Sequence, residues 1–359
     1  MIKTPTISSS QLFIMLITSR MFSMFTYKPQ KLNLSFTAAA LAIILSVIIN
    51  ILVFAPTLCL LNRYKGRNVA DCVALQQKER AGLYSVLMLA VCLFLSIECV
   101  TQFEIFMAST IYTSASPVFF ILPLVLVCAF LCRLGIESMA RMASYVFGGL
   151  IFCFVIIAVA ALPKTDTVWI EPLGYDSTKE FFGFVADNVF HTTEIIPFMF
   201  LASYAKGNLK KGTISFGVAT GAMFIIISFF IITALGNYRQ AVLFPFYTVS
   251  AMAQSTLSER FNAAYITLWV FMGAVRLCVY LFVSAKCIRE LKHFKNDTIP
   301  LIFSSGIVIV TSLITTRQIF YVNIMYSVIV TGLPIILLAV IYPLALLIGK
   351  KAGERRQKD

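Results

Sequence analysis

Long apolar segments alternate with short polar connections along nearly the whole chain. A helix that crosses a hydrocarbon core of about 30 Å needs about 20 mostly apolar residues. Ten segments meet this requirement and predict spanning helices at 7–27, 34–61, 81–109, 117–133, 143–162, 181–204, 212–235, 260–285, 299–316 and 322–348. Because little sequence remains between them, the pattern predicts an all-α, polytopic membrane protein that forms one domain over residues 1–359.

Composition supports this class. Hydrophobic residues make up 59% of the chain and charged residues 13%, and the mean hydropathy of +0.89 lies far above that of soluble domains. The nine cysteines fall in apolar spans or in loops expected inside, so they predict no disulfide framework. No cysteine or histidine cluster has metal-ligand spacing, and we expect no metal and no cofactor. The opening residues lack a signal-peptide cleavage site, which favours a first helix that is retained.

The distribution of basic residues predicts the orientation. With the N-terminus inside, the inner segments hold 20 of the 29 lysines and arginines and the outer segments hold seven. This bias predicts that both termini are cytoplasmic. The net charge of +13 is then a sign of topology, so we expect lipid contacts for the basic tail and no nucleic-acid partner.

Four charged residues lie near the middle of spanning segments: Arg20, Glu98, Glu194 and Arg276. Each charge costs roughly 2.5 to 3.5 kcal/mol at the centre of a membrane, so buried charges pair with one another or line water. Their common depth on four helices predicts one central site, with Arg20 and Arg276 balanced by Glu98 and Glu194. Two structural salt bridges without a ligand are the alternative.

The sixth segment contains a predicted interruption. Pro197 removes one backbone donor and clashes with the carbonyl of Thr193, beside Glu194 and His191. Freed backbone groups, hydroxyls and a charge therefore coincide at mid-membrane. A simple proline kink, with Glu194 satisfied by a neighbouring helix, is the alternative.

The first segment contains a second candidate interruption, in the polar run around Thr18, Ser19, Arg20 and Ser23. Interrupted helices at the first and sixth positions of ten are typical of two inverted repeats, here about 7–162 and 181–348, with a binding site between them. The outer connection at 236–259 contains the sequence FPFYTV, and both a lid over a cavity and a plain surface loop fit this composition.

Three stretches resemble the spore-germination permeases, the family of the B subunit of nutrient germinant receptors within the amino-acid/polyamine/organocation (APC) transporter superfamily. They are ISSSQLFIMLITSRMFSMFTYKP at 7–29, FHTTEIIPF at 190–198 and FPFYTVSAMAQSTLSERFNAAYITLW at 244–269. The resemblance extends over essentially the whole chain. It implies a LeuT-like fold whose broken helices 1 and 6 form an amino-acid-sized pocket.

The resemblance also implies binding residues. The F-x-x-x-E pattern at 190–194 matches the pocket lining of helix 6, and 18–23 matches the unwound part of helix 1. The superfamily usually has glycines in that part, whereas TSRMFS has none. Arg20 then either binds a substrate carboxylate or is a fixed cation where a transporter uses sodium, and we favour the second role. The candidate ligand-binding residues are Thr18, Ser19, Arg20, Ser23, Glu98, Phe190, His191, Thr192, Thr193, Glu194 and Arg276.

The function predicted from the resemblance is that of a receptor subunit in the spore inner membrane. It would bind a small nutrient, an amino acid by expectation, and signal to the A and C subunits of the receptor. The alternative is a proton-coupled amino-acid permease in which Glu194, Glu98 or His191 carries the proton. We do not expect an enzyme, because the sequence has no G-x-S-x-G motif and no Walker loop.

Overall fold

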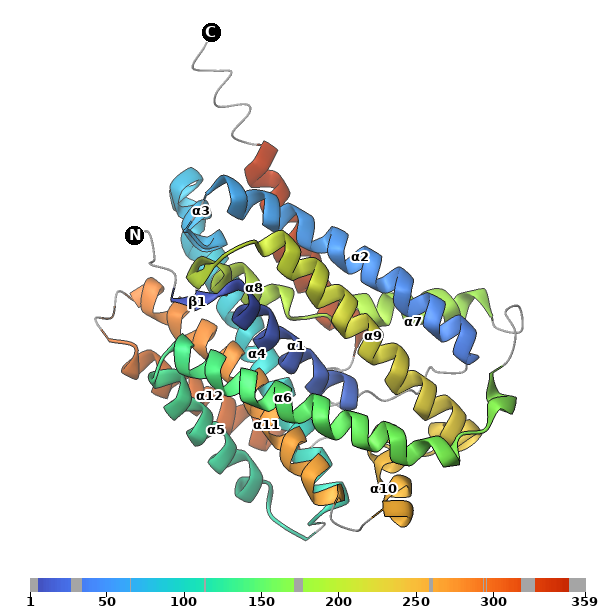
Figure 1. Ribbon diagram of the computed structural model, residues 1–359. Coiled ribbons are helices and arrows are strands. Elements are labelled where there is room, and N and C mark those ends of the chain that lie inside the picture. The colour runs from blue at the N-terminus through green and yellow to red at the C-terminus, as the bar shows by residue number, and fades with distance from the viewer. Residues whose placement is uncertain are drawn as a thin grey trace.

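The computed structural model describes residues 6–26, 34–64, 66–112, 114–170, 177–257, 261–292, 294, 296–317 and 327–348. This part is a bundle of long helices with two very short strands (Figure 1). The strands are β1 (Ile7–Ser8) and β2 (Ala205–Lys206), and the helices are α1 (Ser9–Phe25), α2 (Phe36–Arg63), α3 (Val69–Gln76), α4 (Lys78–Thr110), α5 (Pro117–Arg133), α6 (Ile136–Ala161), α7 (Thr178–Phe190), α8 (Ile195–Leu201), α9 (Leu209–Leu235), α10 (Pro245–Leu257), α11 (Phe261–Lys292), α12 (Thr298–Thr315) and α14 (Val328–Pro334), which continues as a π-helix over Ile335–Ile341.

Each of the ten predicted spans coincides with helix. They correspond in order to α1, α2, α4, α5, α6, the pair α7 and α8, α9, α11, α12, and α14 with its π-helix. Residue 27 of the first span, residue 260 of the eighth and residues 322–326 of the tenth lie outside the described residues. Within the described part, seven helices are long and apolar enough to cross a membrane, and α5 is a shorter apolar helix. The prediction of a polytopic helical membrane protein is therefore confirmed.

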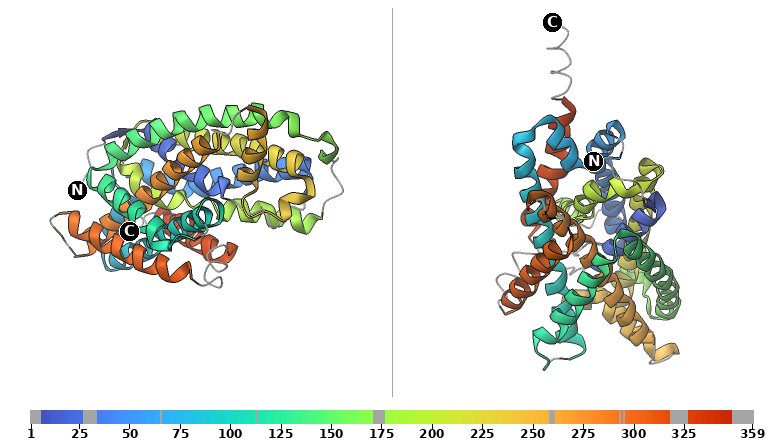
Figure 2. Two further views of the ribbon diagram at one scale, coloured as in Figure 1. Left: turned by 90° about the horizontal axis from the view of Figure 1, so that it is seen from below. Right: turned by 90° about the vertical axis from the view of Figure 1, so that its left-hand side faces the viewer.

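Helix α1 lies in the middle of the bundle. It packs against α6, α9 and α11, while α2 packs on α9, α4 on α11 and α5 on α12. In Figure 1 α1 lies between α6 and α9, and Figure 2 shows the same bundle from two further sides. The outer helices present large apolar side chains away from the bundle, including Leu52, Phe119 and Phe152. Such a surface is typical of a protein surrounded by lipid.

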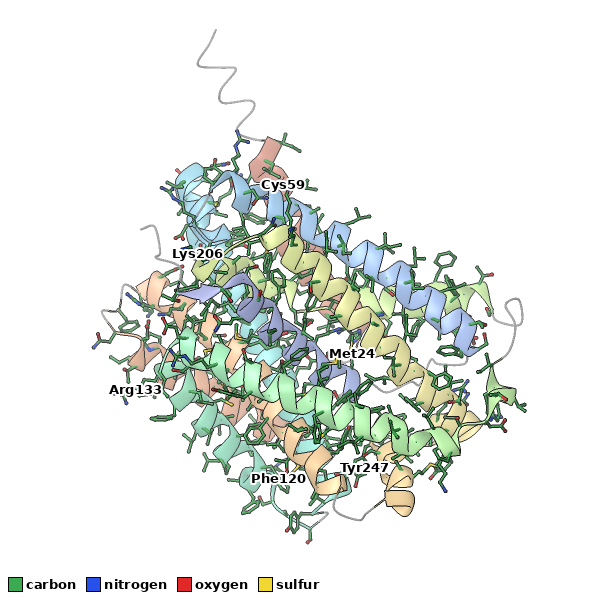
Figure 3. The ribbon with its side chains drawn as sticks, viewed as in Figure 1. Met24, Cys59, Phe120, Arg133, Lys206 and Tyr247 are labelled. Atoms are coloured by element: carbon green, nitrogen blue, oxygen red, sulfur yellow. The ribbon has the colours of Figure 1, made fainter. Side chains whose placement is uncertain are left out.

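The first residues of α1 are joined to the chain that follows α8. β1 pairs with β2 in parallel, with Ile7 opposite Ala205 and Ser8 opposite Lys206. The Ser8 side chain also caps α1 by accepting a hydrogen bond from the N–H of Gln11. Figure 3 shows that Lys206 lies toward the same end of the bundle as Arg133, and we call it the basic end. The start of helix 1 and the end of helix 6 therefore meet at the basic end.

Ion pairs join α11 to α12. Asp297 accepts hydrogen bonds from Lys286 at 2.5 Å and from Arg289 at 3.0 Å. Burial alone would raise the pKa of Asp297, but the hydrogen bonds and charges of Lys286 and Arg289 outweigh it. The pKa of this carboxyl is therefore below its ordinary value.

Two helices fall outside the predicted spans. α3 lies between the second and third spans, and α10 lies in the connection at 236–259, which we expected to be a lid or a surface loop. Pro245 occupies the first position of α10, where its missing N–H costs nothing. The ring of Phe246 lies 4.7 Å from that of Phe25, the last residue of α1. α10 therefore covers the end of α1 that lies away from the basic end.

Candidate functional site

Helix 6 is interrupted near its middle. Residues 191–194 form turns between α7 and α8, as the sequence predicted. Pro197 lies in the first turn of α8, where proline is tolerated because its N–H would have no partner within the helix. The carbonyl of Thr193, which we expected to be free, accepts a hydrogen bond from the N–H of Ile196 at 3.0 Å. Instead, the carbonyls of Asn188 and His191, at the end of α7, accept hydrogen bonds from Arg20 of α1.

Arg276 is the centre of a buried ion-pair cluster. Its Nη1 lies 2.6 Å from Oε1 of Glu194, and its Nη2 lies 3.5 Å from Oε2 of Glu98. These three residues, the Arg276 cluster, are between 0% and 3% exposed. The cluster joins α11, the break of helix 6 and α4. The prediction that Arg276 is balanced by the two glutamates is confirmed.

Hydroxyl groups around the break orient this cluster. Ser19 of α1 donates its hydroxyl to Oε1 of Glu194 at 3.2 Å, and Arg276 donates to the carbonyl of Ser19 at 3.4 Å. Arg276 also donates to Oγ1 of Thr193 at 3.2 Å, which lies 2.7 Å from the hydroxyl of Tyr280. Tyr280 was missed by the sequence analysis, although it lies four residues after Arg276 on the same helix face.

The other carboxylate is held from the side of α4. Gln102 donates its side-chain amide to Oε1 of Glu98 at 2.9 Å, and Thr26 donates its hydroxyl to the amide oxygen of Gln102 at 3.2 Å. Glu98 and Gln102 are four residues apart and therefore lie on one helix face. This chain fixes one carboxylate oxygen of Glu98 and leaves the other facing Arg276.

Arg20 forms a second polar cluster at the end of α7. Its guanidinium donates to Oδ1 of Asn188 at 2.7 Å, to the carbonyl of Asn188 at 3.3 Å and to the carbonyl of His191. It also lies 3.4 Å from the hydroxyl of Ser23. Among the described residues Arg20 forms no direct ion pair with a glutamate, so the predicted pairing is absent as a contact, although the charge of Glu194 still acts on Arg20 through space. The last carbonyls of a helix lack partners and carry its negative dipole end, so they attract this cation.

Helix α1 is continuous through the residues that we expected to be unwound. Ser9–Phe25 is helical throughout, and the hydroxyl of Thr18 donates to the carbonyl of Ile14 at 2.8 Å on the same helix. The run at 18–23 contains no glycine and no proline, and hydroxyls bonded four residues back are compatible with a helix. The expected break in helix 1 is absent over Ser9–Phe25, and Thr18 points back onto its own helix.

Helix α2 supplies polar partners that the sequence analysis missed. Asn188 donates to the hydroxyl of Ser46 at 3.1 Å, and Asn50 donates to the hydroxyl of Thr192 at 3.1 Å. Ser46 and Asn50 are four residues apart in an otherwise apolar span. That spacing is a signal that periodicity analysis can detect, because it puts both residues on one face.

Two further candidates lie beside these clusters. Nδ1 of His191 is 2.8 Å from the carbonyl of Asp187 and 3.5 Å from its carboxylate. The ring of Phe190 packs against Gly332 and lines an apolar groove of about 340 Å³ beside α14. The structure therefore brings Ser19, Glu98, Thr193, Glu194 and Arg276 together in one cluster and Arg20, Ser23, Thr192 and the backbone of His191 in another.

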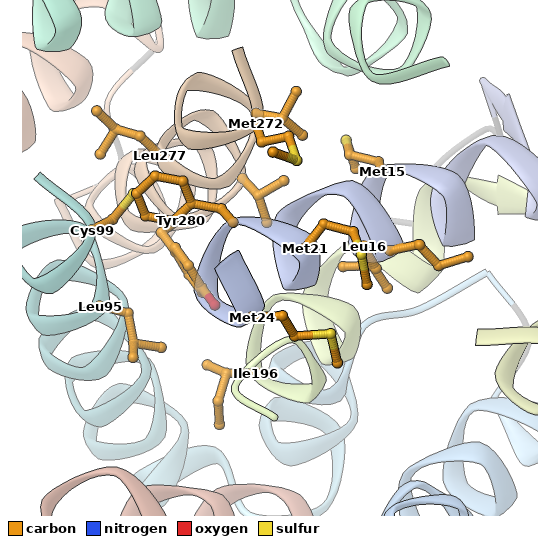
Figure 4. Packing of buried hydrophobic residues seen from close by; sticks show 14 of the residues in the cluster. Met15, Leu16, Met21, Met24, Leu95, Cys99, Ile196, Met272, Leu277 and Tyr280 are labelled. Atoms are coloured by element: carbon orange, nitrogen blue, oxygen red, sulfur yellow. The ribbon is translucent and has the colours of Figure 1, made fainter. Parts of the chain in front are cut away.

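Apolar side chains enclose the central cluster. Figure 4 shows some of these buried side chains, among them Met21 on α1, Leu95 on α4, Ile196 on α8 and Met272 on α11. Toward α10, the ring of Trp269 contacts those of Phe22, Phe103 and Phe106 at centroid distances of 4.1 to 5.4 Å. Electrostatic interactions are strong where water is excluded. The ion pairs of the Arg276 cluster are therefore strong.

Comparisons with known proteins agree over nearly the whole chain. The family model described as "Spore germination protein" matches residues 6–321. The structure is similar to that of MhsT in complex with L-phenylalanine, with a TM-score of 0.66 and 13% identity over 96% of this chain and 99% of that one. It is also similar to a Na+-coupled sialic acid symporter, with a TM-score of 0.63 and 12% identity over 88% and 75% of the two chains. A search of curated protein sequences finds no match. The predicted LeuT-like fold is confirmed.

Proposed function

Because this chain belongs to the spore germination protein family, we propose that it is the membrane subunit of a spore germinant receptor. It binds a small nutrient, an amino acid by our expectation, between α1, the break of helix 6, α4 and α11. The A and C subunits of the receptor take up the signal. The fold of the solved neighbours supports a nutrient-binding membrane protein.

The contact between Arg20 and α7 is the observation that carries this proposal. A fixed guanidinium occupies carbonyl oxygens that become available where helix 6 is interrupted. In transporters with discontinuous helices, such carbonyls coordinate a mobile coupling ion. A cation that is part of the chain cannot bind and leave in each transport cycle, as a coupling ion does. The site is therefore suited to binding a ligand without an ion gradient.

The orientation of the chain in the membrane, its division into two inverted repeats and its cellular location are part of the same proposal. The basic end is cytoplasmic, both termini lie there, and the protein resides in the spore inner membrane. The repeats are about 7–162 and 181–348, and the packing of α2 on α9, α4 on α11 and α5 on α12 supports them, because these are the second, third and fourth spans of each half. The activity is binding rather than catalysis.

A proton-coupled amino-acid permease is the second candidate. It is favoured by the contact between His191 and Asp187 beside the break, where an imidazole nitrogen lies 3.5 Å from a carboxylate oxygen. In this case His191 or Glu194 carries the proton while the substrate crosses.

Uptake and binding assays distinguish the two. Purified protein in liposomes, tested with each of the 20 common amino acids, is expected to bind at least one of them equally in sodium and in choline buffers. It is expected to show no accumulation when a proton or sodium gradient is imposed. Spores lacking the chain are expected to lose germination to one nutrient class. Concentrative uptake would assign the protein to the permeases.

A further inference from the structure

Three buried polar atoms of the Arg276 cluster have no hydrogen-bond partner among the described residues. They are Oε2 of Glu98, Oε2 of Glu194 and Nε of Arg276. Nearly all buried polar groups in folded proteins are hydrogen-bonded, and each exception calls for an explanation. The two acceptors belong to carboxylates that both pair with Arg276, and the donor belongs to Arg276 itself, so one cluster offers both kinds of group.

The charges of this cluster do not cancel. One guanidinium faces two carboxylates, so the formal charge of the cluster is −1 when all three are ionised. Arg20 is also buried and adds one positive charge that interacts with Glu194, but Asp187, which interacts with Arg20, adds one negative charge, so the formal charge remains −1 when both are included. A buried charge is costly unless it is paired. The cluster is therefore suited to receive one additional positive charge.

The two ion pairs are unequal. Arg276 donates a hydrogen bond of 2.6 Å to Glu194, whereas its contact with Oε2 of Glu98 is 3.5 Å long and leaves that oxygen without a hydrogen bond. Gln102 holds the opposite oxygen of Glu98 in place. Oε2 of Glu98 is therefore oriented toward the cluster and can accept a bond from another donor while Arg276 remains bound to Glu194.

We propose that Glu98 and Glu194 bind the primary ammonium group of the nutrient and that Nε of Arg276 donates to an acceptor atom of the same molecule. This inference rests on the proposed function. An ammonium group has one positive charge and three N–H donors, two of which match the two carboxylate oxygens without a hydrogen bond, and its charge matches the charge of −1. A bare metal cation fits less well, because it leaves the N–H of Arg276 without an acceptor and prefers more oxygen ligands.

The test uses the purified full-length protein and its thermal unfolding with added compounds. The panel is alanine and leucine, the matching amines ethylamine and isoamylamine, the matching acids propionate and 4-methylpentanoate, and glucose, each in sodium and in choline buffer. For wild type, we expect a rise in unfolding temperature only with compounds that carry a primary amine. Glu98→Gln is expected to weaken that binding at least tenfold, because a neutral amide keeps the size and loses the charge.

Glu104→Gln is the matched control. Glu104 is a buried carboxyl on the same helix, and no hydrogen bond or ion pair in the described part of the chain joins it to the Arg276 cluster. We expect this variant to bind as wild type does. Glu98→Asp, which keeps the charge, is expected to retain amine binding in part, so that a folding defect of Glu98→Gln is recognised separately.

The outcomes separate this inference from the proposed function. If only propionate, 4-methylpentanoate or glucose stabilises the protein, the nutrient receptor stands and the ammonium site is wrong. Amine binding that Glu98→Gln leaves unchanged also overturns the site. If sodium alone raises the unfolding temperature and Glu98→Gln abolishes that rise, the occupant is a metal cation. If no compound has an effect, the ammonium site is wrong, and the binding assay with all 20 amino acids then decides the proposed function.

Discussion

Replacing Arg276 is expected to be more damaging than replacing Glu194. Arg276 is the shared partner of two carboxylates and its side chain is 1% exposed, so solvent screens neither pair. Arg276→Met leaves both carboxylates without their ion-pair partner, and we expect it to lower the free energy of unfolding by about 3 to 5 kcal/mol. Glu194→Gln removes one charge-assisted hydrogen bond and leaves the guanidinium beside Glu98, at a cost of about 1.5 to 3 kcal/mol.

Unfolding of the detergent-purified variants by heat and by denaturant measures this difference. The triple variant Glu98→Gln, Glu194→Gln, Arg276→Met removes all three charges together, and we expect it to regain much of the stability that Arg276→Met loses. Arg141→Met is the control, because its pair with Glu137 is exposed and worth about 0 to 1 kcal/mol. The reasoning is refuted if Arg276→Met is no worse than Glu194→Gln, or if the triple variant equals the sum of the single losses.

Three further outcomes are expected. Single cysteines at Thr167 and Lys210, on a background without the nine native cysteines, are expected to react with an impermeant thiol reagent from outside and inside respectively; labelling from one side contradicts the topology. Gly332→Ala places a Cβ 2.6 Å from the ring packed against it and is expected to cost about 1 to 3 kcal/mol in denaturant unfolding, whereas Gly306→Ala, with open space, is expected to be neutral. Asp297 has a lowered pKa in the folded protein, so its contribution to stability is present above the unfolded pKa of about 4 and is lost as the pH falls through the folded pKa. The difference in unfolding temperature between wild type and Asp297→Asn is therefore expected to shrink from pH 7 to pH 3, and a constant difference contradicts this.

Hydropathy predicts the depth of a residue in a membrane protein. The span predicted at 117–133 coincides with α5, and the interruption of helix 6 was recognised from Pro197 and Glu194. Arg20, Glu98, Glu194 and Arg276, all expected at one level, are buried in the structure. Depth follows from counting residues along a helix at 1.5 Å each, so it needs no knowledge of the neighbouring helices.

The residue with which a buried charge pairs depends on how each helix is rotated and packed against its neighbours. The sequence of one helix does not give this information. Both arginines lie at the right depth for either glutamate, but Arg276 reaches both and Arg20 reaches the end of α7. The run at 18–23 predicted an unwound helix 1, yet the hydroxyls of Thr18 and Ser23 donate to carbonyls of their own helix, so polarity alone does not break it. α10 was missed because a short helix between spans has the composition of a loop.

Helix α1 is tied to both parts of helix 6. Arg20 binds the end of α7, while β1 pairs with β2 just after α8. The break between these two ties contains Glu194, which is bonded to Ser19 of α1 as well as to Arg276. A ligand that draws Glu194 toward itself therefore acts at the joint of helix 6 while its two ends are held by a continuous α1. Binding can shift the equilibrium between two positions of that joint. The shift is no larger than the difference in the binding free energy of the ligand for the two positions.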